Sequence, residues 1–129
     1  MILLDTYALV WAVAEPRRLS QAAVMAIRES RAEDGLAIAA ITLWELAALV
    51  THGRIQAYGT VEASVRLLVQ GVGIKPLTAE IAALATQFPD DYPRDPADRL
   101  IGATARAEGL PLITRDEKIR RSPLLKTIW

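Results

Sequence analysis

Four acidic residues stand where carboxylates can meet in a folded chain. Three of them directly follow short apolar segments or lie in the first turn of the next helical pattern, and the fourth begins a helical pattern entered from a proline-rich stretch. They are Asp5, Glu45, Asp98 and Asp116. Carboxylates gathered in one place repel each other unless a cation offsets their charge, and Mg²⁺ and Mn²⁺ prefer oxygen ligands. These residues therefore indicate a candidate metal site.

Each of these acids also has a simpler interpretation as part of a helix cap, because Asp, Thr and Glu satisfy free backbone N–H groups at helix starts. The caps would be Asp5 before residues 6–15, the capping box Thr42–Glu45, Asp95 with Asp98 in the following turn, and the box Thr114–Glu117 around Asp116. Spacing alone does not show that the acids converge, because strand order cannot be read from one sequence. Both interpretations stay open at this point.

The elements that must position these acids alternate along the chain. Short continuous apolar runs predict buried strands at 2–5, 36–40, 73–77, 110–114 and 126–129. Helical spacing predicts helices at 6–15, 21–32, 42–53, 60–70, 79–88, 96–109 and 115–121. Ser20, Thr78 and Asp95 are the expected N-caps, and residues 88–95, rich in proline and aspartate, are expected to be irregular. This alternation predicts an α/β fold whose central parallel sheet is covered by helices on both faces, with ligands bound beyond the carboxyl ends of the strands.

Composition predicts a folded protein with one domain over residues 1–129. The chain is 52% hydrophobic and 23% charged, which argues against disorder. It contains no cysteine, which excludes disulfides, thiolate zinc sites and cysteine nucleophiles. No apolar stretch is long enough to span a bilayer, and the N-terminus has no basic region typical of a signal peptide. We therefore expect a cytoplasmic protein that does not contact a membrane.

Three stretches together resemble the PIN-domain toxins of type II toxin–antitoxin pairs, the VapC family. They are LLDTYALVWA, LWELAALVTHGRI and DPADRLIGATARAEGLPLITRDEKI, and the resemblance extends to the closing IW. It implies a PIN fold, a parallel sheet between helices with an acidic pocket at its carboxyl edge. By matching positions, Asp5, Glu45, Asp98 and Asp116 correspond to the family's four acids, which we call the acidic quartet. Thr6 and Thr114 correspond to its accessory hydroxyl positions.

The resemblance also implies a metal-dependent endoribonuclease. The quartet would hold one or two Mg²⁺ or Mn²⁺ ions, with Asp5 and Asp98 as the expected direct ligands, Asp116 bound directly or through water, and Glu45 as a ligand or a group that orients the attacking water. Hydrolysis by activated water would leave a 5′-phosphate and a 3′-hydroxyl. The chain has one histidine, His52, so a paired-histidine route through a cyclic phosphate does not fit. His52 is expected to end a helix instead.

Basic and aromatic side chains give weaker signals. Net charge is formally zero, so no global field draws the chain to nucleic acid. Arg99 and Arg115 stand beside the proposed acids and are candidates for contact with the RNA backbone, although Arg99 could equally pair with Asp95 or Asp98. The three tryptophans, at positions 11, 44 and 129, could stack on bases, but their apolar neighbours favour core packing.

The implied partners are an RNA substrate and a cognate antitoxin whose C-terminal segment blocks the acidic pocket. Homodimers, or higher hetero-oligomers with the antitoxin, are also implied. Two other classes compete with the ribonuclease. A catalytically inactive PIN domain would bind RNA or protein, but such domains usually lose members of the quartet. A metal-dependent phosphatase on a similar sheet would be expected to show an Asp-x-Asp motif after the first strand, and the sequence there reads DTY.

Overall fold

A five-stranded, fully parallel sheet forms the centre of the protein in a computed structural model that describes residues 1–129. The strand order is β3-β2-β1-β4-β5, so the first strand along the chain lies in the middle. The strands are β1 (Ile2–Leu4), β2 (Leu36–Ala39), β3 (Val72–Lys75), β4 (Leu112–Ile113) and β5 (Thr127–Ile128). The predicted α/β fold with a parallel sheet is confirmed, and each of the five predicted strands is present.

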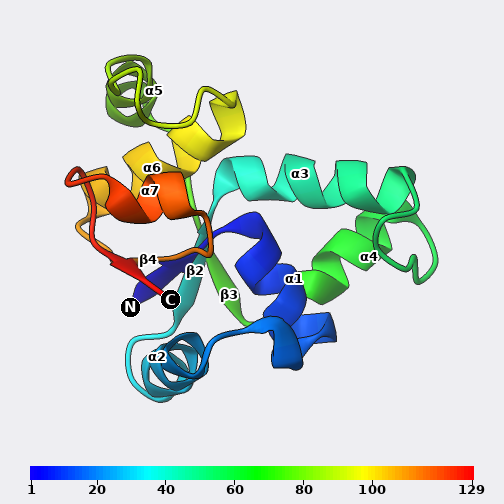
Figure 1. The fold of residues 1–129 in the computed structure, drawn as a ribbon. Coiled ribbons are helices and arrows are strands. Elements are labelled where there is room, and N and C mark those ends of the chain that lie inside the picture. Colours follow the sequence, from blue (N-terminus) through cyan, green and yellow to red (C-terminus); the bar gives the residue numbers. More distant parts are fainter.

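Helices cover both faces of this sheet (Figure 1). They are α1 (Thr6–Ala14), α2 (Gln21–Ala32), α3 (Ala40–Thr51), α4 (Val61–Leu68), α5 (Ala79–Thr86), α6 (Pro96–Glu108) and α7 (Glu117–Arg121), with a short 3₁₀ turn at Pro16–Arg18. Neighbouring strand residues point to opposite faces. Leu4 and Ile38 pack with side chains of α1, α2, α3 and α4. Leu3 and Ala37 pack with side chains of α5, α6 and α7.

The register of the sheet brings the ends of its central strands together. Leu3 is paired with Ala37 of β2 on one side and with Leu112 of β4 on the other. The Asp5 N–H then donates to the Ile113 carbonyl over 3.1 Å. The residues that follow β1, β2 and β4 therefore emerge at one edge of the sheet, which is the edge where ligands bind in open α/β folds.

Several predicted helix ends are confirmed. The side chains of Ser20, Thr78 and Asp95 accept backbone N–H groups at the starts of α2, α5 and α6. Gly109 ends α6 with φ of 66°, in the left-handed region where glycine carries no penalty. His52 is the C-terminal cap of α3, and its Nδ1 lies 2.7 Å from the Ala48 carbonyl oxygen. Residues 89–95, between α5 and α6, contain no helix or strand, as expected.

Both predicted capping boxes are wrong. Helix α3 begins at Ala40, immediately after β2, and its cap residue Ala39 provides no side-chain hydrogen bond. Thr42 and Glu45 consequently lie inside the helix, where neither caps its start. Helix α7 is capped by Asp116, whose carboxylate accepts the Ile119 N–H over 3.1 Å, so Thr114 lies before the cap position.

Tryptophan packing follows the prediction at two positions and departs from it at the third. Trp11 is buried in the core, and Trp129 packs against it with ring centroids 5.9 Å apart. Trp44 is 68% exposed, so the prediction of core packing is wrong there. The apolar neighbours of Trp44 in sequence lie on other faces of α3, which rotates about 100° per residue. No helix of the structure combines the length and apolar character needed to cross a membrane.

Candidate active site

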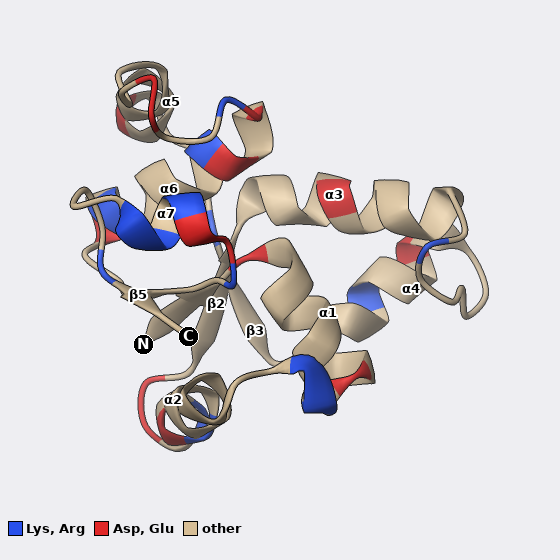
Figure 2. Cartoon of the chain, in the orientation of Figure 1, with Lys and Arg blue, Asp and Glu red and all other residues tan.

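The acidic quartet lies at the carboxyl edge of the sheet, where Figure 2 shows several acidic segments close to one another. Asp5 directly follows β1 and caps α1, Asp98 lies in the first turn of α6, and Asp116 caps α7. Glu45 reaches the same region from the middle of α3. These residues come from four segments far apart in sequence. Strand order supplies the convergence that spacing alone could not predict.

Burial raises the pKa values of Asp5 and Asp98, and the charges of the other acids of the quartet add to the effect. The charges of Glu45 and Asp116 both raise the pKa of Asp5. The charges of Glu45, Asp116 and Asp5 all raise the pKa of Asp98. Like charges in proximity favour protonation of one another, so the cluster holds its negative charge at a free-energy cost. A bound cation would remove that cost.

Asp5 has two functions in the structure. Its Oδ1 accepts the Ala8 N–H over 2.8 Å, which makes it the N-cap of α1. Burial raises the pKa of its carboxyl group from 3.8 to about 6, with smaller contributions from neighbouring acids. A hydrogen bond from the Thr114 hydroxyl and the bond from Ala8 act in the opposite direction by stabilising the carboxylate. Asp5 is therefore a cap and a member of the acid cluster at the same time.

Thr114 connects Asp5 to Asp116. Its side chain is fully buried at the end of β4, and its hydroxyl oxygen accepts the Asp116 N–H over 3.2 Å. The same hydroxyl stabilises the Asp5 carboxylate and so lowers its pKa. Thr114 therefore holds the backbone of one acid and stabilises the charge of a second, as an accessory hydroxyl would.

Glu45 is held by a pair of threonines. The Thr6 hydroxyl donates to its Oε1, and the Thr42 hydroxyl oxygen lies 3.1 Å from that of Thr6. Burial raises the pKa of Glu45, the hydrogen bond from Thr6 lowers it, and the charge of Asp95 raises it. Thr6 and Thr42 are both buried, so these contacts are shielded from water. Thr42 was expected to be a helix cap, and its contact with Thr6 was not predicted.

Asp98 is the most strongly perturbed acid of the quartet. Burial raises its pKa from 3.8 to about 7, and the charge of Asp95 contributes next, ahead of those of the other three acids. Asp95 was predicted only as a helix cap, and it does accept the Ala97 N–H over 3.0 Å. Its charge also acts on Asp98 and Glu45, which makes it a fifth acid of this edge.

The donor set fits a hard divalent cation, because every candidate ligand in the cluster is a carboxylate. Carboxyl groups with raised pKa values also release protons more easily when a cation binds beside them. In the arrangement observed, however, no group of three or more acidic or histidine side chains is positioned to hold an ion. The chemistry of the residues fits the metal, and the ligand geometry is not preformed.

Arg99 does not pair with either neighbouring aspartate. Its guanidinium donates to four backbone carbonyls, those of Ala85, Phe88, Pro89 and Tyr92, at 2.7–3.5 Å. These contacts bind the end of α5 and the loop after it to α6. The alternative of an ion pair with Asp95 or Asp98 is therefore not observed, and the donors of Arg99 are used within the protein. Arg115 is exposed, with its guanidinium carbon 5.9 Å from the centre of the Trp11 ring.

Tyr92 is a neighbour of the site that the sequence did not reveal. It is buried, its hydroxyl donates to the Asp98 carbonyl over 3.3 Å, and its ring meets Phe88 edge to face with centroids 4.7 Å apart. Burial and the nearby acids raise its pKa well above the ordinary value of 10.0, so it stays protonated. Its position inside a proline- and aspartate-rich loop gave no signal of burial.

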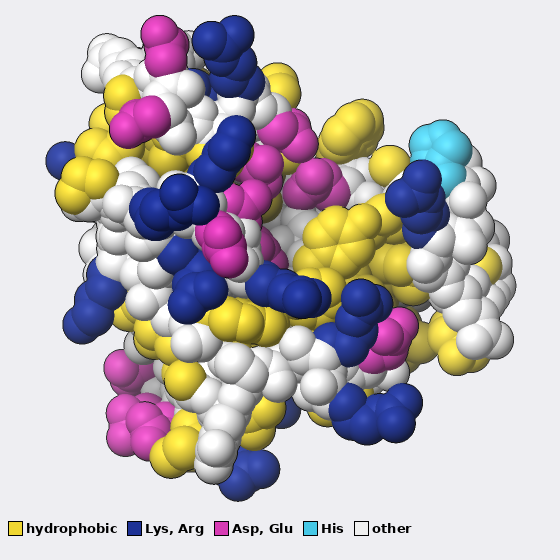
Figure 3. Space-filling view, viewed as in Figure 1, with side chains coloured by type: hydrophobic (Ala, Val, Ile, Leu, Met, Phe, Trp, Pro, Cys, Tyr) yellow, Lys and Arg dark blue, Asp and Glu magenta, His cyan; other side chains and the backbone are white.

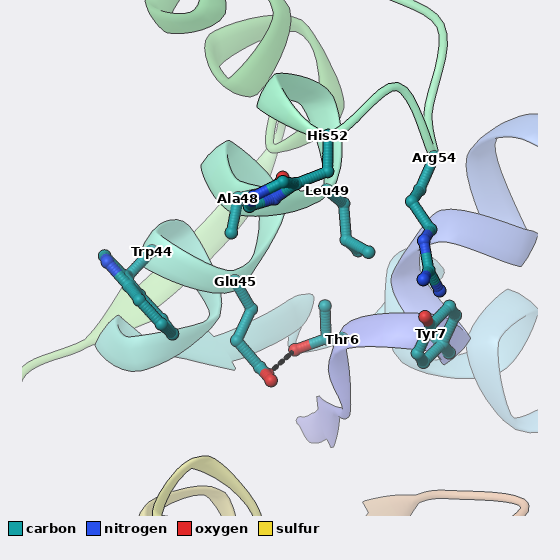
Figure 4. A pocket seen from close by; sticks show the side chains of 8 residues that line it. All are labelled: Thr6, Tyr7, Trp44, Glu45, Ala48, Leu49, His52 and Arg54. Carbon is teal, nitrogen blue, oxygen red and sulfur yellow. Dashed lines mark hydrogen bonds between the residues drawn. The ribbon is translucent and has the colours of Figure 1, made fainter.

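A pocket of about 590 Å³ opens beside Glu45, between α1 and α3. Its lining includes Thr6, Tyr7, Trp44, Glu45, Leu49 and Arg54. In Figure 4, Trp44 lies at one end, Tyr7 and Arg54 lie at the other, and Glu45 with Thr6 lies between them. On the molecular surface, acidic side chains gather in a hollow that is flanked by basic side chains and by a hydrophobic area (Figure 3). The acid cluster is thus continuous with a surface of mixed aromatic and basic character.

Comparisons with known proteins agree on the fold. The PIN domain family matches residues 2–123. Ribonuclease VapC22 of Mycobacterium tuberculosis is 42% identical over 130 residues, covering 99% of this chain and 98% of that protein. The solved structure of DNA-bound VapBC from Salmonella typhimurium superposes with a TM-score of 0.73 at 18% identity, covering 98% of this chain and 97% of that chain. A toxin–antitoxin complex from Klebsiella pneumoniae gives 0.70 at 24% identity, covering 97% and 95%.

Proposed function

The chain belongs to the PIN-domain family, among the VapC ribonucleases of toxin–antitoxin pairs, and from this we propose that it is a divalent-metal-dependent endoribonuclease. The observation that carries the proposal is the placement of Asp5, Glu45, Asp98 and Asp116 at one edge of the sheet. Burial raises the pKa values of Asp5 and Asp98, and the charges of the other acids raise them further. Such a concentration of acids is costly for stability alone and is typical of a site that binds cations.

The residues of the cluster divide into ligands and orienting groups. Asp5 and Asp98 would hold Mg²⁺ or Mn²⁺ directly, and Asp116 would hold it directly or through water. When bound, the ion lowers the pKa of water and stabilises charge on the scissile phosphate. Glu45, fixed by the Thr6 hydroxyl, would serve as a further ligand or orient the attacking water and accept its proton. Thr114 keeps Asp5 and Asp116 in place.

The substrate and products follow from this chemistry. Attack of water on an RNA phosphodiester breaks the bond between phosphorus and the 3′ oxygen, leaving a 5′-phosphate and a 3′-hydroxyl. The single histidine caps α3 and is bonded to the Ala48 carbonyl, which leaves no pair of histidines for a cyclic-phosphate route. End-labelling of the fragments checks this step directly, because cyclic or 3′-phosphate ends would contradict it.

We also infer a protein partner that blocks this site. Solved structures with the same fold include DNA-bound VapBC and a toxin–antitoxin complex. A cognate antitoxin would lay a C-terminal segment over the acid cluster, where a basic side chain could offset the charge of the quartet. Homodimers, or hetero-oligomers with the antitoxin, are part of the same proposal. Size-exclusion chromatography with light scattering checks them, and a strictly monomeric protein would remove the dimer.

The experiment that tests the activity is cleavage of total bacterial RNA by antitoxin-free protein with Mn²⁺ or Mg²⁺. We expect discrete cleavage that is lost in EDTA and in Asp5→Asn. The matched control is Asp34→Asn, which changes an exposed aspartate just before the amino end of β2, at the opposite edge of the sheet. Asp34→Asn should cleave like the wild type. Folded protein that neither binds Mn²⁺ nor cuts RNA would contradict the proposal and favour a non-catalytic PIN domain.

A further inference from the structure

We propose that the pocket between α1 and α3 binds an unpaired nucleotide of the RNA substrate, with its base stacked on Trp44 and a neighbouring phosphate near Arg54. This inference rests on the proposal that the chain acts on RNA. It adds a binding subsite beside the acid cluster and assigns a recognition function to residues outside the quartet.

The exposure of Trp44 is the first observation. Its side chain is 68% exposed on α3, whereas Trp11 is buried and Trp129 packs on Trp11. Tyr7, which lines the same pocket from α1, is 48% exposed. Large aromatic side chains left in water lose the stabilisation that burial provides, so two of them around one pocket indicate a surface that a ligand covers.

The position of the pocket is the second observation. Glu45 and Thr6 belong both to the acid site and to the lining of this pocket, and Trp44 directly precedes Glu45. A molecule in the pocket therefore lies directly beside the cleavage site. In an RNA chain, the groups next to the scissile phosphate are the flanking nucleotides, so a nucleotide is the ligand that this continuity favours.

Charge at the pocket is the third observation. The Arg54 side chain extends toward Tyr7 at the end opposite Trp44 (Figure 4). Its guanidinium forms no ion pair or side-chain hydrogen bond within the protein. This differs from Arg99, whose donors are occupied by backbone carbonyls. An aromatic face combined with a free guanidinium matches the base and the phosphate of single-stranded nucleic acid.

The test measures RNA binding without cleavage, using a short unstructured RNA oligonucleotide in EDTA. Of the three tryptophans, Trp44 is the exposed one, so stacking should quench its fluorescence. We expect Trp44→Ala to weaken binding about tenfold, within the range typical of one stacked base, and Trp44→Phe to retain most of the affinity. Tyr58→Ala is the matched control, because Tyr58 is 58% exposed but does not line this pocket.

A second arm separates the base from the phosphate. A series of oligonucleotides, each lacking the base at one position, identifies the stacked base. The wild type should bind one member of the series clearly more weakly than the intact RNA. Trp44→Ala should bind that member and the intact RNA about equally, because both changes remove the same stack. Arg54→Gln should reduce the slope of log affinity against log salt by about 0.7, the value for one phosphate contact on a single strand.

Two results would overturn the subsite. One is RNA binding without quenching of Trp44, and the other is equal affinity of wild type and Trp44→Ala. If Trp44→Ala instead weakens only the association with the antitoxin, the pocket belongs to the protein partner. Failure of the nuclease proposal is distinguishable, because quenching by RNA in a protein that cuts nothing would leave the binding subsite standing.

Discussion

The Thr6 hydroxyl donates a hydrogen bond to the Glu45 carboxylate and so joins the start of α1 to the middle of α3. Thr6 has one hydroxyl proton, and Glu45 accepts it. The contact of 3.1 Å between the Thr6 and Thr42 hydroxyl oxygens must therefore be donated by Thr42. The two threonines form a short chain of donors that ends on one acid of the quartet.

Thr42→Val should weaken this chain without changing side-chain shape. The buried Thr6 hydroxyl would lose its donor, which should lower the free energy of unfolding by about 1 kcal/mol and reduce cleavage several-fold. Thr42→Ser keeps the hydroxyl and should retain activity close to that of the wild type. Urea unfolding and Mn²⁺-dependent cleavage measure the two effects. Equal activity of the valine and serine variants would show that Thr42 does not position Glu45.

The metal-free protein should become less stable as pH rises. Asp98 has a pKa of about 7 and Asp5 of about 6 in the folded protein, both above the ordinary 3.8. Between pH 3.8 and about pH 7, the folded state therefore binds more protons than the unfolded state. The stability that these protons provide is lost as pH rises through about 7. We expect thermal unfolding in EDTA to occur about 5 °C higher at pH 5 than at pH 8. Asp98→Asn should reduce this difference, and Asp34→Asn should not.

Mn²⁺ should reverse that trend by stabilising the charged cluster. At pH 8, saturating Mn²⁺ should raise the unfolding temperature of the wild type, because it binds the folded state only. Asp98→Asn should bind Mn²⁺ more weakly while remaining folded by circular dichroism. Affinity should also fall between pH 8 and pH 5.5, where protons compete for Asp98 and Asp5. Calorimetric titration measures both effects, and unchanged affinity in folded Asp98→Asn would count against Asp98 as a ligand.

Replacing Arg99 should affect mainly the stability of the protein, whereas replacing Arg115 should affect mainly its RNA binding. Arg99→Gln removes donors to four carbonyls around Phe88 and should destabilise the protein by about 2–3 kcal/mol. Arg115→Gln changes an exposed side chain and should leave stability nearly unchanged while weakening RNA binding. Chemical unfolding and the salt dependence of RNA affinity separate these outcomes. A stable Arg99→Gln variant whose RNA affinity depends less on salt would support Arg99 as an RNA contact.

Gly102→Ala should be destabilising although alanine favours helices. A Cβ atom at this position would lie 2.2 Å from the Tyr92 hydroxyl oxygen and 2.9 Å from its ring. Because Tyr92 is buried, its ring or helix α6 must shift, at a cost of about 1–3 kcal/mol. Gly73→Ala is the control, since its nearest contact would be an ordinary 3.5 Å. Comparable unfolding midpoints for both variants would show that the Tyr92 ring can move aside easily.

Local features of the fold were predictable because they depend on neighbours in sequence. Apolar runs identified the strands, and Ser20, Thr78 and Asp95 identified three helix starts. The capping box at Thr42 failed because α3 begins at Ala40, directly after β2, without a side-chain cap. The box at Thr114 failed because Asp116 is the cap of α7. The apolar residues next to Trp44 in the sequence do not show that Trp44 is in the core, because adjacent residues of a helix point in different directions.

Features that depend on contacts between distant segments could not be read from local patterns. The acid cluster requires β1, β2 and β4 to lie side by side, and family resemblance rather than spacing supplied that expectation. The donor chain through Thr42 joins residues 36 positions apart. Sequence proximity suggested that Arg99 could pair with Asp95 or Asp98. In the structure, four backbone carbonyls at the end of α5 and in the loop after it accept its hydrogen bonds instead.

The central position of β1 constrains when the acid cluster can form during synthesis. The ribosome makes Asp5 early, whereas β4 and Asp116 follow more than a hundred residues later. The nascent chain must therefore carry its first strand without the β4 neighbour until more than a hundred further residues have been made. The quartet therefore cannot assemble on a chain that lacks β4 and the residues directly after it, whatever the state of the other three acids.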